Sequence, residues 1–90
     1  MRFALMTKDK PGALQTRLDN RAAHLAYIEE TGVVEMAGPV LDEAGEMCGS
    51  LIVLEVDDLA AAQAWAANDP YAKAGLFAET TLRAWKKVVG

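Results

Sequence analysis

Short apolar runs alternate along this chain with two longer segments of helical periodicity. Residues 3–7 are apolar and end at the turn-rich residues 8–12, which predicts a first strand. From Ala13 to Thr31 the apolar spacing becomes three or four, which predicts a helix that ends at Gly32. The stripe expected to be buried on this helix consists of Leu14, Leu18, Ala22, Leu25 and Ile28.

The second half of the pattern predicts three more strands and a second helix. Residues 33–41 form a strand whose Gly38-Pro39 pair indicates a bulge, a strand end or a close backbone approach. A polar hairpin loop at 42–46 leads into the most strand-like run, residues 48–56. Asp57-Asp58 caps a helix from Leu59 to about Asn68, and residues 77–89 form a last strand.

Residues 68–75 separate that helix from the last strand. Pro70 disfavours helical geometry at Asp69, so the helix is expected to end there. Asp69 can then be the N-cap of a short second helix, with Pro70 at its first position and Gly75 after its end. Two interpretations of Asp69 stay open: a simple cap, or a carboxylate held at a kink for a functional partner.

The element order is therefore βαββαβ with a short extra helix. Right-handed crossovers on a small antiparallel sheet predict a ferredoxin-like α+β sandwich with both helices on one face. Residues 51–54 are all apolar, so both faces of that strand favour burial. Because two helices cover only one face, we expect a second copy to cover the other, giving a homodimer that packs sheet to sheet.

Composition narrows the class of protein. Ninety residues make one domain, 1–90. No apolar run approaches the roughly 20 residues that span a bilayer, and the N-terminal apolar stretch is too short for a signal peptide. With a net charge of −4 and no basic block, nucleic acid and membranes are not expected partners. We expect a cytoplasmic location.

Metal sites and disulfides are also not expected. Cys48 is the only cysteine, which excludes an internal disulfide and a cysteine-based zinc site. His24 is the only histidine, so a metal centre is not predicted and no cofactor is expected.

His24 is the first candidate for chemistry. Arg17, Arg21 and His24 are spaced four and three apart, so they lie along one edge of the first helix. One interpretation is a solvated edge with partners such as Asp19 or Glu29. The other is an anion-attracting rim around an imidazole, the side chain whose charge changes nearest neutral pH.

Several motifs together carry a family resemblance. They occur in order along nearly the whole chain: Arg21-Ala22-Ala23-His24-Leu25, Ala37-Gly38-Pro39, Gly49-Ser50, Ala64-Trp65-Ala66, Asp69-Pro70-Tyr71 and Ala74-Gly75. With this set the chain resembles the YCII-related (YciI-like) family. The resemblance implies a dimeric α/β barrel with an active site centred on His24 and Asp69. It also implies that some relatives eliminate chloride from hydroxylated aromatics.

Two functional hypotheses follow. The first is a cofactor-free lyase or isomerase that transfers protons on a small anionic or phenolic molecule. His24 would be the acid or base and Asp69 would orient it, while Arg21, Ser50, Tyr71 and Gly38 would bind substrate. The second is a non-catalytic small-ligand-binding or regulatory homodimer that uses the same pocket.

Overall fold

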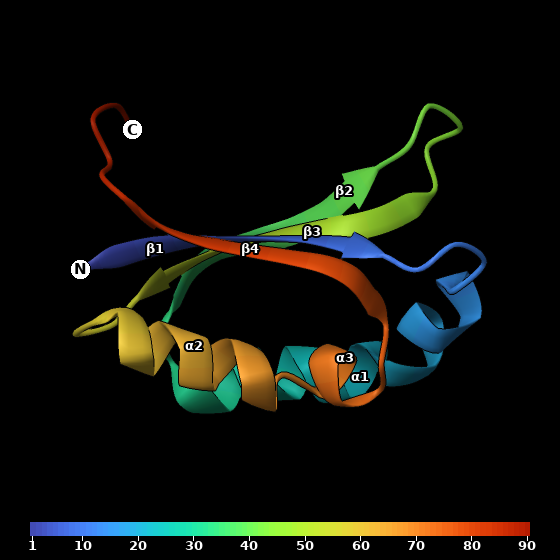
Figure 1. The fold of residues 1–90 in the computed structure, drawn as a ribbon, viewed down its shortest axis with the longest axis horizontal. Helices are drawn as coiled ribbons and strands as arrows, with labels where there is room; N and C mark the ends of the chain where they lie inside the picture. The colour runs from blue at the N-terminus through green and yellow to red at the C-terminus, as the bar shows by residue number, and fades with distance from the viewer.

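Helices lie on one face of a four-stranded antiparallel sheet in the computed structural model, which describes residues 1–90 (Figure 1). The strand order is β2-β3-β1-β4. This confirms the predicted ferredoxin-like α+β fold. The elements are β1 Arg2–Asp9, α1 Leu14–Thr31, β2 Val34–Leu41, β3 Met47–Glu55, α2 Leu59–Asn68, α3 Pro70–Lys73 and β4 Phe77–Trp85.

The core lies between the sheet and the helices. Strand β1 alternates, so that its odd-numbered residues from Phe3 to Asp9 are buried beneath the helices. The buried apolar cluster combines strand and α2 side chains: Phe3, Leu5, Ile52, Leu54, Ala62 and Trp65. Asp58 caps α2 by accepting a hydrogen bond from the Ala61 N–H at 2.8 Å, as the sequence predicted.

The predicted buried stripe of α1 is confirmed only in part, at Ile28, which packs against the core. Leu18 and Leu25 are 44% and 51% exposed, whereas the buried residues of α1 are Arg17 and His24. Each buried polar side chain has a carboxylate partner from another element, which offsets the cost of removing its charge from water. The helix therefore turns a polar edge toward the sheet, and that edge becomes the wall of a pocket.

Strand β2 also differs from expectation. It continues through Gly38 and Pro39, and its register shifts lie on either side of them, at Val34/Met36 and Val40/Leu41. Because β2 is an edge strand, Pro39 does not interrupt a central ladder. A Cβ on Gly38 would meet no atom within 4 Å, so no close backbone approach requires glycine there.

The last strand is shorter than predicted. Strand β4 ends at Trp85 rather than Val89, because its partner β1 begins at Arg2 and these two residues pair. Beyond Trp85 no strand is present to accept further hydrogen bonds.

The sheet face opposite the helices has no cover within the chain (Figure 1). Leu51 on this face is 39% exposed, whereas Val53 is already buried by its neighbours, so the predicted two-sided burial holds only in part. Met6, Met36 and Trp85 are further exposed apolar side chains. None of the helices is long and apolar enough to cross a membrane.

Candidate functional site

Asp69 is held at the break between α2 and α3. Its backbone is extended (φ −60°, ψ 129°), as expected for a residue before proline, and Pro70 occupies the first position of α3. Asp69 Oδ1 accepts the Tyr71 N–H at 3.1 Å, so the predicted N-cap is present. The side chain is completely buried, which fixes the carboxylate in position.

The same oxygen contacts His24. The distance from His24 Nδ1 to Asp69 Oδ1 is 2.7 Å, across 45 residues of sequence. A carboxylate only accepts hydrogen bonds, so Nδ1 carries the proton and Nε2 of the neutral ring presents a lone pair. Asp69 Oδ2 is buried without a hydrogen-bond partner, so the carboxylate is held only through Oδ1, by His24 Nδ1 and the Tyr71 N–H.

Tyr71 holds the imidazole from the side. The two rings stack with centroids 3.9 Å apart and an interplanar angle of 14°. The backbone N–H of Tyr71 meets Asp69 and its ring meets His24, so one residue fixes both members of the pair. Burial raises the pKa of the Tyr71 phenol, and the positive charges of Arg17 and Arg21 only partly oppose this.

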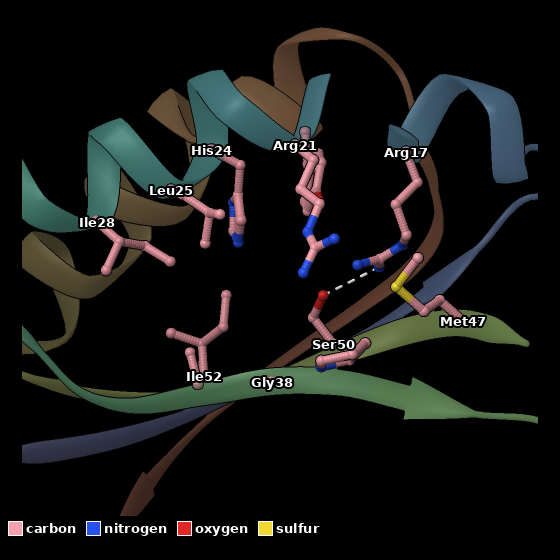
Figure 2. Close-up of a pocket in the computed structure, with 12 residues that line it drawn as sticks. Arg17, Arg21, His24, Leu25, Ile28, Gly38, Met47, Ser50 and Ile52 are labelled. Atoms are coloured by element: carbon pink, nitrogen blue, oxygen red, sulfur yellow. Dashed lines mark hydrogen bonds between the residues drawn. The ribbon is translucent and has the colours of Figure 1, made fainter. Parts of the chain in front are cut away.

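Arg17 is buried rather than solvated. Its Nε and Nη2 donate to the two carboxylate oxygens of Asp9 at 2.7 and 2.9 Å. Nη2 also donates to Ser50 Oγ at 3.0 Å, drawn as the dashed line in Figure 2. Burial acts to lower the pKa of Arg17, but the hydrogen bonds and charge of Asp9 outweigh it and leave the pKa raised. Asp9 therefore replaces the expected partners Asp19 and Glu29.

Arg21 lies between these two centres. Figure 2 shows its guanidinium and the His24 ring extending from α1 toward the sheet, with Arg17 farther along the helix. Arg21 has no salt bridge to any carboxylate, unlike Arg17. Its charge is therefore available to a ligand.

These side chains share one pocket of about 180 Å³ between α1, α3, β2 and β3. The polar groups at its wall are Arg17, Arg21, His24, Ser50 and Tyr71. The apolar wall comes from Leu25, Ile28, Ala37, Pro39, Met47 and Ile52, with Gly38 also on the lining. An apolar cavity of about 150 Å³ accommodates benzene, so this volume suits one substituted six-membered ring.

Gly49 explains how Ser50 reaches this wall. A Cβ on Gly49 would lie 2.2 Å from the backbone oxygen of Thr7, so only glycine lets β3 approach β1 here. The next residue, Ser50, then faces the helices beside Ile52 and is buried.

The structure thus brings together all six residues proposed from sequence. Five line the pocket, and Asp69 lies directly behind His24. The sequence pattern does not predict Asp9 as a site residue, because it ends the first strand at Thr7 and places Asp9 in a turn, whereas β1 continues to Asp9. Its signal was present in the sequence, since Asp9 continues the odd-numbered alternation of Phe3, Leu5 and Thr7.

The structure contains no group of three or more His, Cys, Asp or Glu side chains that could hold a metal ion. The chemistry offered by the pocket residues themselves is an acid–base nitrogen, hydrogen-bond donors and one unneutralised cation.

Comparison with known proteins gives a family match, a relative and two similar solved structures. The family described as "YCII-related domain" matches residues 1–86. The protein YciI of Escherichia coli O6:H1 is 36% identical over 97 residues, covering 98% of this chain and 99% of that protein. An antibiotic biosynthesis monooxygenase, 13% identical with a TM-score of 0.61 over 98% of both chains, shares the fold alone.

The second of these solved structures is similar to this chain in both sequence and fold. It is the 5-chloro-2-hydroxyhydroquinone dehydrochlorinase TftG of Burkholderia phenoliruptrix, in complex with 2,5-dihydroxybenzoquinone. The two chains are 40% identical with a TM-score of 0.87, over 96% of this chain and 94% of that one.

Proposed function

Because this chain belongs to the YCII-related family, we propose that it is a proton-transfer enzyme of the lyase or isomerase type. Its substrate would be a small hydroxylated ring that binds in the pocket beside His24. The observation that carries this proposal is the 2.7 Å contact between His24 Nδ1 and Asp69 Oδ1. It leaves Nε2 as the free basic nitrogen at the pocket wall.

Three features support a ring as the substrate. The cavity of about 180 Å³ has the size for one ring with a few substituents. Its walls are apolar except for a few polar groups, which is typical of small-molecule sites. The similar dehydrochlorinase acts on a hydroxylated ring and binds a quinone.

The proposed step is base-assisted elimination from the tautomer in which the carbon bearing the leaving group is tetrahedral. His24 Nε2 takes the proton of a ring hydroxyl, and the O–H electron pair becomes the second bond of a carbonyl. The adjacent double bond shifts, and the leaving group departs as an anion with its bonding pair. The ring has then lost HX, and the imidazolium is compensated by Asp69.

Arg21 would hold the ring in this proposal. Its unpaired guanidinium lies at the pocket beside His24, where it can neutralise negative charge on a ring oxygen. A phenolate or another small anionic ligand is therefore favoured over a cation.

We also propose that a second copy of the chain covers the open sheet face. The exposed apolar side chains Met6, Met36, Leu51 and Trp85 support this, since a folded protein favours their burial.

The direct test of function is chloride release from 5-chloro-2-hydroxyhydroquinone by wild type, His24→Gln and Thr80→Ala. Thr80 is exposed on β4 outside the pocket, so Thr80→Ala is the matched control. We expect release by wild type and the control, and a loss of at least about 100-fold in His24→Gln.

The alternative is the non-catalytic ring-binding protein. Ring binding by wild type, without chloride release or exchange of ring hydrogens with deuterated water, would favour that alternative. Equal turnover by His24→Gln would exclude His24 as the base.

A further inference from the structure

The proposed proton transfer does not use the buried ion pair between Arg17 and Asp9. Side chains of both residues are nearly inaccessible, with 3% and 6% of their surface exposed. Burying two charges is costly even when they are paired, and it is often no more stabilising than apolar packing. Arg17 lines the pocket at the end away from His24 and is held there by Asp9, which points to a role for the pair in the site.

The role follows from the hydrogen bond between Arg17 and Ser50. A guanidinium has only donors, so Arg17 Nη2 must use an oxygen lone pair of Ser50. The Ser50 hydroxyl has one proton of its own to donate, and no acceptor in the chain takes it. Ser50 is buried and lines the pocket, so this proton is available only to a ligand there.

Asp9 fixes the direction in which the Arg17 guanidinium points toward Ser50. By holding Nε and Nη2 of Arg17 at once, it fixes the plane of the guanidinium. The same Nη2 then meets Ser50 at a fixed angle, and accepting a bond from a cation makes the serine O–H a stronger donor. Gly49 places Ser50 at this point by allowing the close approach of β3 to β1.

We propose that Arg17 and Asp9 are positioning residues that make Ser50 a hydrogen-bond donor to an acceptor oxygen of the ligand. This inference rests on the proposed function. With His24 as the base, one end of the pocket accepts a proton from the ligand and the other end donates a hydrogen bond to it. His24 accepts a proton at one end, Ser50 donates to oxygen at the other, and the Arg21 guanidinium lies between them (Figure 2). The ligand class is a ring with an acidic hydroxyl at one position and a carbonyl or phenolate oxygen at another.

The test is a binding titration with 2,5-dihydroxybenzoquinone, followed by its visible absorbance. Wild type, Ser50→Ala, Arg17→Lys and the double variant are compared, and Thr80→Ala is the control for hydroxyl loss outside the pocket. Arg17→Lys keeps the charge opposite Asp9 but lacks the planar fork that bonds Asp9 and Ser50 together.

We expect Ser50→Ala to lower affinity about fivefold to tenfold, the effect of one hydrogen bond. Arg17→Lys should lower affinity by a similar factor when serine is present, and by less than twofold in the Ser50→Ala background. This dependence separates positioning from a structural role, which would act equally in both backgrounds.

Each other outcome has a distinct meaning. If wild type binds the probe and Ser50→Ala binds it equally well, Ser50 is not a donor and this inference fails alone. If Arg17→Lys lowers affinity equally in both backgrounds, Arg17 does not act through Ser50 and the inference also fails. If wild type binds no probe, the proposed function fails and this inference fails with it.

Discussion

At the scale of single residues, Asp69 combines two tasks in one oxygen atom. Oδ1 caps α3 through the Tyr71 N–H and also contacts His24 Nδ1. The backbone break at Pro70 fixes Asp69, and Asp69 in turn fixes the ring orientation of His24. The helix cap at Asp69 therefore also positions His24, a residue distant in sequence. Both interpretations of Asp69, as a cap and as a partner of another residue, are present in the geometry.

Substitution of Asp69 can separate these tasks. Asparagine caps about as well as aspartate and keeps an acceptor oxygen, so Asp69→Asn should lower the free energy of unfolding by less than about 1 kcal/mol. It removes the charge opposite the imidazole, so chloride release should fall at least about tenfold. Urea unfolding and turnover measure the two effects. Equal turnover in Asp69→Asn would show that Asp69 is only a cap.

Tyr71 gives a prediction on pH. Because burial raises its folded pKa, the unfolded phenol ionises first, near its ordinary value of about 10. The stability contributed by the neutral phenol is fully present below that value and is lost as pH rises through the raised folded pKa. Tyr71→Phe should therefore show a shallower decline of melting temperature as the pH rises above about 10, the ordinary pKa of the phenol. An identical decline in both proteins would contradict this.

At the scale of elements, α1 shows why sequence periodicity gave the helix but not its buried face. Spacing placed the helix within one residue of its observed start and at its end. Which face is buried depends on partners distant in sequence, since Arg17 and His24 enter the interior only with Asp9 and Asp69. No local pattern contains those pairs. The family resemblance identified the second pair, whereas the first needed the three-dimensional structure.

The Arg17–Asp9 pair joins α1 to β1 and gives an element-scale prediction. Arg17→Met or Asp9→Leu alone leaves a buried charge unpaired and should lower the free energy of unfolding by about 3–5 kcal/mol. The double variant removes both charges and should be within about 2 kcal/mol of wild type. Urea unfolding of the four proteins measures this coupling. Additive losses would mean that the two charges do not stabilise each other.

At the scale of the whole molecule, the open sheet face exposes apolar side chains that no other part of the chain covers. Helices cover one side of the sheet, and the apolar side chains on the other remain exposed within the single chain (Figure 1). Small domains bury a limited fraction of their surface, so covering this face would add stability that a chain of 90 residues otherwise lacks.

Light scattering tests the assembly. We expect wild type at micromolar concentration to have twice the 9.7 kDa mass of the chain, about 19 kDa. Leu51→Lys places a charge on the open face and should yield the monomer mass. Leu59→Lys, at a leucine on α2 that is 46% exposed against 39% for Leu51, should stay dimeric. A wild-type monomer would contradict sheet-to-sheet packing.

The central claim is that Asp69 orients His24 so that Nε2 is the basic nitrogen of the pocket. The most direct measurement is the ¹⁵N NMR spectrum of the imidazole, which is unambiguous because the chain has one histidine. With the ring neutral, we predict a protonated Nδ1 and an unprotonated Nε2, and addition of 5-chloro-2-hydroxyhydroquinone should move the Nε2 signal toward the protonated position. A proton on Nε2 with Nδ1 unprotonated, or an Nε2 signal that the ring compound leaves unchanged, would contradict the account.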